Sequence, residues 1–325
     1  MLQDAPLEVR VTRKQGEAED ICSLELASLS GDALPPFAAG AHIDVHVGGL
    51  VRQYSLCNNP AERHRYLIAV LREPQSRGGS TAIHDHVQVG QTLRISAPRN
   101  LFPLAPAAPH SLLLAAGVGV TPILCMAERL SHAGQAFDMH YCARSRSRMA
   151  FRERMASSPF AGSVQFHADD EVQAQPASRF DLPAVLAAAP AGTHLYACGP
   201  AGFLAHVLDT ARARGWPEER LHHEFFAAPA ARPAMAAGAF EVCVASTGQT
   251  AVVGPDETVV DALARLGVAV QTSCGQGVCG TCLTRVLAGV PDHRDMVLTP
   301  GEQALNDQFT PCCSRALSGS LTLDL

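Results

Sequence analysis

The sequence predicts a multidomain protein in which an antiparallel β-barrel and a parallel α/β domain precede a smaller third domain. Short alternating apolar segments, separated by Gly, Pro and Asn clusters, run from about Leu7 to Leu104; Ala41–Val47 and Tyr66–Val70 are examples. From Ser111 to Phe226, continuous apolar strands alternate with helical patterns, which indicates a parallel sheet. An Ala- and Pro-rich run at 227–238 then separates this region from the last segment.

These differences in sequence pattern predict the domain boundaries. We expect a barrel domain at 1–104, an α/β domain at 105–227, a linker at 228–239 and a third domain at 240–325. In the α/β domain the expected strands include Ser111–Ala116 and His194–Cys198, and the expected helices include Pro122–Ala133 and Phe203–Arg214.

Composition excludes several classes of protein. The chain has 325 residues, 47% of them apolar and 17% charged, with mean hydropathy +0.07, which favours a soluble globular protein over a disordered or membrane protein. No run of Lys and Arg gives electrostatic support to nucleic-acid or membrane binding. The first twenty residues read as neither a secretory signal nor a transit peptide, so we expect the chain to start near Met1 and to be cytoplasmic.

The charge is unevenly distributed. The segment Phe240–Leu325 holds nine acidic residues and four arginines, a balance of 9 − 4, or five negative charges, against a net charge of −6 for the whole chain. The third domain is therefore expected to be the acidic part of the molecule.

The eleven cysteines carry the strongest chemical signal. Cys274, Cys279 and Cys282 have the spacing C-x4-C-x2-C, and Cys312 follows after a long gap. This is the plant-type pattern of a [2Fe–2S] cluster, in which four thiolates hold two irons. Three intervening glycines permit positive φ and a close approach of backbone N–H groups to the sulfurs; they are Gly275, Gly277 and Gly280.

Two alternatives remain open at this site. A structural zinc site would also use cysteines, although zinc modules usually have paired C-x2-C knuckles and only one such pair is present here. Cys313 adjoins Cys312, so either residue can be the fourth ligand. The remaining cysteines occur singly and are interpreted as small buried residues: Cys22, Cys57, Cys125, Cys142, Cys198 and Cys243.

The last segment resembles a plant-type ferredoxin domain, with FTPCCSRALSG at the final ligand, and this resemblance implies an α+β β-grasp fold. In the barrel, the run Arg52-Gln53-Tyr54-Ser55 resembles the R-x-Y-S motif that surrounds a flavin in the ferredoxin-NADP reductase superfamily. A cationic fork and backbone donors at a helix N-terminus suit a flavin phosphate, and Arg52 together with Gly78, Gly79, Ser80 and Thr81 supplies both. Tyr54 offers an aromatic face, and the hydroxyl of Ser55 can reach the reactive edge of the ring.

Two glycine loops in the α/β domain point to a nicotinamide cofactor. The run Gly117-Val118-Gly119-Val120-Thr121-Pro122 departs from the G-x-G-x-x-G fingerprint and resembles the G-x-G-x-T-P loop of the same superfamily. Cys198-Gly199-Pro200 ends a later strand, where the carboxyl ends of parallel strands form a ligand crevice. Weaker candidates are Arg144 and Ser145 for the adenosine end and Phe226 for packing on the flavin. The pair His222-His223 is expected at the surface.

In order, the three domains resemble the phthalate dioxygenase reductase family, which includes vanillate demethylase reductases. Matching runs are RQYSLCN, YLIAVLREPQSRGGS, PRNLFPL, AAGVGVTPI, YCARS, YACGP and CGQGVCGTC with CCSRA. The resemblance implies FMN, NADH and a [2Fe–2S] cluster as cofactors, with Cys312 as the fourth ligand. It also implies cofactor contacts at the motif positions already named and at Val70, and roles in hydride transfer for Ser55, Cys198 and Phe226.

The function implied by the resemblance is that of a monomeric reductase component that passes electrons from NADH through FMN and the cluster to a Rieske-type oxygenase in aromatic catabolism. An arginine at position 144 can accept a 2′-phosphate, so a preference for NADPH stays open. Two other functions also stay open: a stand-alone NAD(P)H:acceptor reductase and a redox-sensing binding protein. The sequence does not indicate which substrate the oxygenase transforms.

Overall fold

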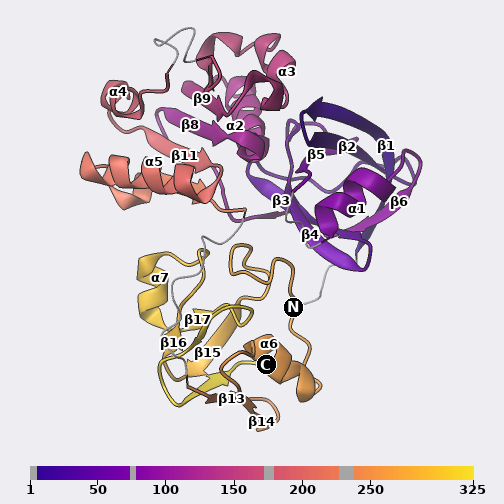
Figure 1. Ribbon diagram of the computed structural model, residues 1–325, viewed down its shortest axis with the longest axis vertical. Helices are drawn as coiled ribbons and strands as arrows, with labels where there is room; N and C mark the ends of the chain where they lie inside the picture. Colours follow the sequence, from indigo (N-terminus) through magenta and orange to yellow (C-terminus); the bar gives the residue numbers. More distant parts are fainter. Residues whose placement is uncertain (1–5, 74–77, 172–178, 227–237) are drawn as a thin grey trace. The chain divides into compact units, whose positions relative to one another are not determined.

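The computed structural model describes residues 6–73, 78–171, 179–226 and 238–325. The chain divides into two compact units, Met1–Phe226 and Ala227–Leu325 (Figure 1). Most of the expected linker, and Arg77 of the RGGS run, lie outside the described residues. The barrel and the parallel sheet both belong to the first unit, so the boundary expected at 104/105 falls within one compact body and stays a prediction.

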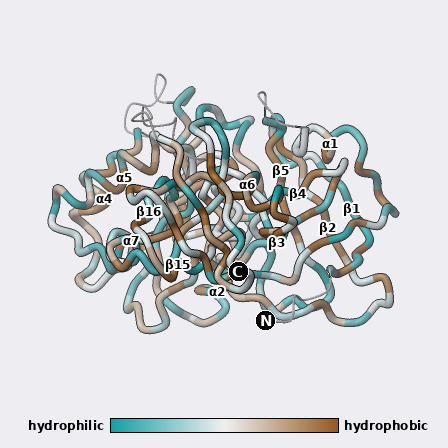
Figure 2. The backbone as a smooth tube through the Cα atoms, turned by 90° about the horizontal axis from the view of Figure 1, so that it is seen from below, coloured by the Kyte–Doolittle hydropathy of each residue, from teal (hydrophilic) through white to brown (hydrophobic). Residues whose placement is uncertain are grey.

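The first sheet is antiparallel and follows the order β4-β3-β6-β1-β2-β5, with β7 paired to β3. A bridge between Leu56 and Ile68 joins the two ends of this order and closes the barrel. The core between the strands is apolar, and it draws largely on β2 and β5, which lie in the barrel part of Figure 2. The elements are β1 (Leu7–Ala18), β2 (Ile21–Ser28), β3 (Ala41–Val47), β4 (Leu50–Ser55), β5 (Tyr66–Leu71), α1 (Gly79–His86), β6 (Thr92–Ile95) and β7 (Arg99–Asn100).

The second sheet is parallel and has the order β10-β9-β8-β11-β12. The chain runs outward from β8 through β9 to β10 and then returns to the other side of β8, so the strand order reverses between β8 and β11. Ligands of open α/β sheets bind at such a switch point. The strands are β8 (Ser111–Ala116), β9 (Phe137–Ala143), β10 (Val164–Ala168), β11 (His194–Cys198) and β12 (Leu221–Glu224).

Helices cover both faces of this sheet, as its continuous apolar strands predict. The apolar side of α2 (Val120–His132) packs on one face, with Ile123 and Leu124 completely buried. The other face is covered by α4 (Leu182–Ala188) and α5 (Ala201–Ala213). The short helix α3 (Arg152–Ala156) lies after β9.

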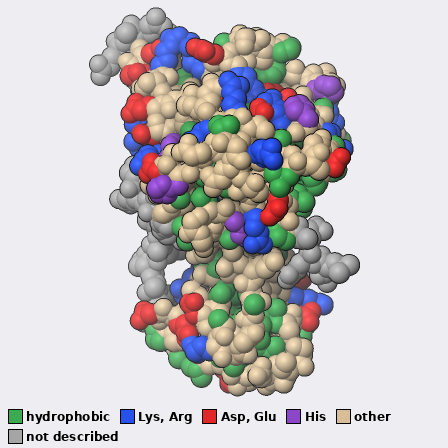
Figure 3. Space-filling model, turned by 90° about the vertical axis from the view of Figure 1, so that its right-hand side faces the viewer, with side chains coloured by type: hydrophobic (Ala, Val, Ile, Leu, Met, Phe, Trp, Pro, Cys, Tyr) green, Lys and Arg blue, Asp and Glu red, His purple; other side chains and the backbone are tan. Residues whose placement is uncertain are grey.

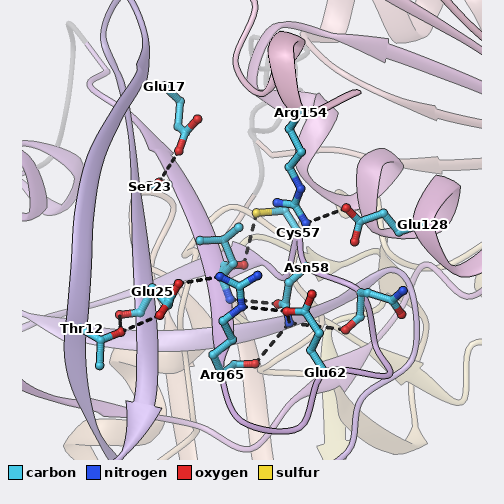
Figure 4. Close-up of polar contacts among 12 residues, drawn as sticks. Thr12, Glu17, Ser23, Glu25, Cys57, Asn58, Glu62, Arg65, Glu128 and Arg154 are labelled. Carbon is cyan, nitrogen blue, oxygen red and sulfur yellow. Dashed lines mark hydrogen bonds and ion pairs between the residues drawn. The ribbon is translucent and has the colours of Figure 1, made fainter. Parts of the chain in front are cut away.

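A polar network lies inside the first unit beside the barrel (Figure 4). The guanidinium of Arg65 lies between the carboxylates of Glu25 and Glu62, at 2.5 and 2.7 Å. Arg154 of α3 pairs with Glu128 of α2 at 2.6 Å. A cavity of about 230 Å³ opens beside these side chains, but none of its lining residues belongs to the expected flavin or nicotinamide sites. These charges are paired with one another, which indicates a structural role.

The second unit contains a mixed sheet of order β14-β13-β19-β15-β17, in which β13 and β19 are parallel and the other pairs are antiparallel, and a separate antiparallel pair, β16-β18. Its two helices begin with capping boxes, Thr258 with Asp261 and Thr299 with Glu302. The elements are β13 (Phe240–Val244), β14 (Thr250–Val253), α6 (Val259–Arg265), β15 (Thr284–Ala288), β16 (Pro291–Asp292), α7 (Pro300–Leu305), β17 (Gln308–Phe309), β18 (Arg315–Ala316) and β19 (Ser320–Leu323).

Acidic and basic side chains are interspersed on the face drawn in Figure 3. Among the described residues, no helix combines the length and the apolarity needed to cross a bilayer.

Candidate functional site

The R-x-Y-S run and the RGGS run meet at the N-terminus of α1. Arg52 lies on β4, and its side chain covers Gly79 so closely that a Cβ built on this glycine would be 2.5 Å from Arg52 Cγ. Gly78 is the N-cap, with φ 95°, and contributes no capping side chain. The N–H groups of the first turn of α1 and the guanidinium of Arg52 therefore lie close together. These donors form the set that a phosphate prefers.

The other barrel residues of the site have different positions. Ser80 Oγ accepts a hydrogen bond from Glu73 N at 3.2 Å, and Thr81 Oγ1 donates to Gly78 O at 3.0 Å. Tyr54 packs against the barrel core, and burial raises its pKa. Val70 is 1% exposed, and its side chain belongs to that core.

The two glycine loops of the α/β domain pack against each other at the switch point. A Cβ on Gly119 would lie 2.3 Å from Cys198 O and 2.6 Å from Gly199 N. A Cβ on Gly199 would in turn lie 2.8 Å from the Cβ of Ala116. Gly117 has φ 56°, and Thr121 Oγ1 donates to Val118 O at 3.1 Å. Pro122 lies in the first turn of α2, and Pro200 is the N-cap of α5. The two glycines thus allow two chain segments to meet at the carboxyl edge of the sheet.

Ser55, Cys198 and Glu224 come together where the barrel meets this edge. Ser55 Oγ donates to Glu224 Oε2 at 3.2 Å. Cys198 and Glu224 are register partners on β11 and β12. Burial raises the pKa of Glu224 to about 7, against the hydrogen bond from Ser55, which lowers it. Burial, and then the charge of Glu224, raises the pKa of the Cys198 thiol, so this residue is a neutral, buried thiol.

The weaker candidates are Arg144, Ser145 and Phe226. Arg144 and Ser145 follow the carboxyl end of β9, where Arg144 O accepts from Asp170 N and the hydroxyl of Ser145 contacts that of Ser147. Phe226 follows β12 and is 40% exposed. Its exposed ring is compatible with packing on a bound group.

One expectation about histidines is wrong. His222 and His223 were expected at the surface but form part of β12 and are partly buried. His222 stacks on Tyr196 with 4.6 Å between ring centroids, and its Nε2 lies 2.9 Å from Nδ1 of His194. The two histidines were expected at the surface because the sequence alone does not show that β11 pairs with their strand and brings Tyr196 against His222.

Five cysteine sulfurs gather in one place in the second unit. The thiol of Cys312 interacts with those of Cys274, Cys282 and Cys313, and the thiol of Cys279 interacts with that of Cys274. Cys279, Cys282 and Cys312 are at most 6% exposed. In the described ranges, no group of three or more His, Cys, Asp or Glu is arranged around a single metal ion. A [2Fe–2S] cluster instead takes four thiolates on two irons, and the donor set fits that group.

The loop around these sulfurs has the predicted backbone. Gly275, Gly277 and Gly280 all have positive φ, between 64° and 70°, which confirms the backbone conformation expected of the three glycines. The amide N of Gln276 donates to Cys274 Sγ at 3.3 Å. Backbone N–H groups that point at sulfur stabilise the thiolate form.

Cys312 and Cys313 differ in their surroundings. Cys312 contacts the thiols of Cys274 and Cys282. Cys313 Sγ lies on Gly277, where a Cβ would be 2.3 Å away, and 3.2 Å from Thr310 Oγ1. Cys312 therefore contacts two residues of the C-x4-C-x2-C run, which favours it as the fourth ligand.

Comparisons with known proteins agree with this geometry. Residues 242–317 match the 2Fe-2S iron-sulfur cluster binding domain, and residues 96–221 match the N-terminal domain of dimethylamine monooxygenase subunit DmmA-like proteins. The chain is 55% identical to the vanillate O-demethylase oxidoreductase of Pseudomonas putida, over 97% of this chain and 98% of that protein. The chain belongs to the vanillate O-demethylase oxidoreductase and phthalate dioxygenase reductase family.

Members of this family differ in the acceptors for which they are named. The tetrachlorobenzoquinone reductase of Sphingobium chlorophenolicum is 39% identical, over 98% of each chain. The solved structure of phthalate dioxygenase reductase, described as a modular structure for electron transfer from pyridine nucleotides to [2Fe–2S], has a TM-score of 0.73 at 36% identity and covers 99% of this chain and 98% of that one. The antiparallel sheet, the parallel nucleotide domain and the ferredoxin domain are therefore the family architecture, and the chain is an oxidoreductase that transfers electrons.

Sequence analysis missed Glu224 as a site residue. The sequence indicated Phe226 at the end of this domain, whereas the carboxylate two positions earlier is the group that contacts Ser55. One available signal was an acidic residue at the carboxyl end of a buried strand, because a carboxylate in that position requires a partner.

Proposed function

We propose that this chain is the NADH-dependent reductase component of a Rieske-type oxygenase system and carries FMN and a [2Fe–2S] cluster. The observation that carries the proposal is the meeting of Ser55, Cys198 and Glu224 between a phosphate cradle on the barrel and two packed glycine loops on the parallel sheet. A flavin held by the cradle and a nicotinamide held by the loops would share this junction.

The barrel residues would bind the flavin end first. The N-terminus of α1 and the Arg52 guanidinium would hold the phosphate, since both present donors to one place. Tyr54 would face the ring, and Gly78, Gly79, Ser80 and Thr81 would line the cradle, with Val70 behind it.

The sheet residues would orient the nicotinamide. Gly117, Gly119, Thr121 and Pro122 form one loop, and Cys198, Gly199 and Pro200 form the second. Cys198 would lie against the nicotinamide as a neutral thiol, and Ser55 and Glu224 would hold a proton between them near the ring edges. Phe226 would cover the flavin until nicotinamide enters, and Arg144 with Ser145 would contact the adenosine end.

A bound flavin supplies the conversion of a two-electron hydride donor into single electrons. Cys274, Cys279, Cys282 and Cys312 would hold the irons that receive them. Plant-type clusters lie near about −400 mV and Rieske centres at about −150 mV or above, so transfer to the partner is favoured by about 10⁴.

The proposal extends to the oligomeric state, the domain boundaries and the cellular location of the chain. We propose a monomer with the domain boundaries 1–104, 105–227, 228–239 and 240–325, acting in the cytoplasm, where NADH is available. The oxygenase meets the organic substrate, so this chain carries no determinant for it.

A second candidate function is the reduction of a small quinone, which the tetrachlorobenzoquinone reductase relative favours. The full chain, reduced anaerobically with NADH, would be mixed either with the oxygenase component of vanillate O-demethylase or with tetrachlorobenzoquinone. The proposal predicts a kcat/KM for the protein acceptor that exceeds that for the quinone. Reduction of the quinone alone would contradict it.

A further inference from the structure

Lys14 is the only lysine in the sequence, since 24 of the 25 Lys and Arg residues are arginines (25 − 1). It lies on β1 and is partly buried. Every other position with a Lys or Arg side chain is an arginine, so the ammonium group at position 14 is an exception in this chain.

The ammonium of Lys14 caps the C-terminal end of α1. Its Nζ donates to the carbonyl oxygens of Ile83, His84 and Val87 at 3.0, 2.7 and 2.8 Å. The last carbonyls of a helix have no partner within the helix, and a cation at that end also stabilises the helix dipole. All three N–H bonds of one ammonium are therefore used on one helix end.

Arginine does not reproduce this contact. An ammonium has three donors that diverge around one nitrogen, whereas the guanidinium is a flat fork that matches the two oxygens of a carboxylate. Three carbonyl oxygens around the end of a helix match the diverging donors of an ammonium. The chemistry of the contact thus explains why a lysine stands at position 14.

The opposite end of the same helix is the phosphate cradle of Arg52 and Gly79. The helix has eight residues, or about 12 Å, and behaves as one rigid piece over that length. Its contacts with the barrel include a hydrogen bond between the His84 ring and Val70 O at 2.9 Å and an exposed ion pair between Asp85 and Arg72. A shift at the C-terminal end would move the N-terminal N–H groups away from Arg52.

We propose that Lys14 is a positioning residue for the flavin phosphate: it fixes the register of α1 on the barrel so that the first-turn N–H groups and the Arg52 guanidinium converge on one phosphate. Lys14 itself touches no flavin atom in this scheme. The inference rests on the proposed flavin site and adds the residue that determines its geometry.

The test compares two flavins that differ only in the phosphate. The full chain, freed of flavin, would be titrated with FMN and with riboflavin by quenching of flavin fluorescence, for the wild type and for Lys14→Met, Lys14→Arg and Arg10→Met. Arg10 lies exposed on the same strand, so Arg10→Met is the matched control for loss of one positive charge. Thermal unfolding followed by circular dichroism shows in each variant that the first unit, which holds Lys14 and Arg10, is folded.

Lys14→Met should weaken FMN binding at least 10-fold and leave riboflavin binding within about 2-fold of the wild type. Lys14→Arg should restore only part of the loss, and Arg10→Met should change neither affinity. Unchanged FMN binding in Lys14→Met, or an equal loss for both flavins, would overturn the inference. A wild-type chain that binds FMN no better than riboflavin would contradict the proposed phosphate site itself.

A second measurement needs no substitution. Besides the α-amino group, Lys14 is the only primary amine of the chain. Labelling with acetic anhydride, followed by mass spectrometry, should modify Lys14 much more slowly in the folded chain than in urea, because its ammonium is held by three carbonyls. Equal rates would show that the contact does not persist in solution and would overturn the inference.

Discussion

Ser55 donates a hydrogen bond to Glu224 over a distance of 3.2 Å, although 169 positions separate the two residues in the sequence. Ser55 ends a barrel strand, and Glu224 ends the edge strand of the parallel sheet. This contact therefore connects the barrel to the parallel sheet.

Glu224 makes stability depend on pH. Folding raises the pKa of this carboxyl from 4.5 to about 7 through burial, so the native state binds the proton more tightly than the unfolded state does. Its contribution to stability is fully present below about pH 4.5 and is lost as the pH rises to about 7. The side chain is partly exposed, so we expect the loss to be about 1–2 kcal/mol.

Glu224→Gln should remove this loss. The free energy of unfolding of the variant, measured by urea titration, should rise relative to that of the wild type between pH 5 and pH 8. Ser55→Ala keeps the carboxyl and removes the hydrogen bond that lowers its pKa, so this control should keep the pH dependence or enlarge it. Parallel pH profiles for Glu224→Gln and the wild type would contradict the assignment.

The packing of the two glycine loops predicts a strong effect at position 119. Gly119→Ala places a Cβ within 2.6 Å of the backbone of Cys198 and Gly199, and backbone atoms cannot move aside as a flexible side chain can. We expect a loss of about 1–3 kcal/mol in unfolding free energy and weaker NADH binding. Gly162→Ala has open space around the new Cβ and should change neither quantity.

These effects are measured by denaturant unfolding and by NADH titration of the oxidised chain. A Gly119→Ala variant as stable as Gly162→Ala, with unchanged NADH affinity, would show that the loops do not form the nicotinamide site.

The two adjacent cysteines should behave differently. Cys312 contacts two thiols of the C-x4-C-x2-C run, whereas Cys313 lies on Gly277. Cys313→Ser should keep the iron content and the visible absorbance of the wild type, and Cys312→Ser should lose most of both. Retention of the cluster in Cys312→Ser together with its loss in Cys313→Ser would assign the fourth ligand to Cys313.

The acidic balance of the second unit predicts that docking depends on salt. Reduction of the oxygenase partner should slow several-fold between about 20 and about 300 mM salt, because screening removes the attraction to a basic patch. Oxidation of NADH with a small neutral acceptor is the control and should change little. Rates of partner reduction that are the same at both ionic strengths would contradict electrostatic docking.

Local patterns in the sequence were sufficient for the barrel and the parallel sheet, whereas the fold of the third domain was expected only from its resemblance to ferredoxins. The expected strands Ala41–Val47, Ser111–Ala116 and His194–Cys198 have the same bounds in the structure, and the helix expected at Pro122–Ala133 is found at Val120–His132. Alternation and continuous apolar runs report burial on one or both faces directly, so these elements depend little on remote residues.

The contacts that complete the site could not be predicted in this way. Glu224 meets Ser55, and Lys14 meets the end of α1, only after strands distant in sequence have paired. Hydrophobic periodicity carries no information about which polar groups become neighbours across two sheets. The glycine loops were predicted because motif resemblance, rather than periodicity, marks them.

The most direct test of the account is an anaerobic titration of the purified full chain with NADH and then NADPH, followed by absorbance, with flavin and iron quantified after acid release. The account predicts one FMN and two irons per chain, with bleaching of both centres at a much lower concentration of NADH than of NADPH. A chain that contains zinc and no flavin would contradict it and would leave Cys274, Cys279, Cys282 and Cys312 with a structural role.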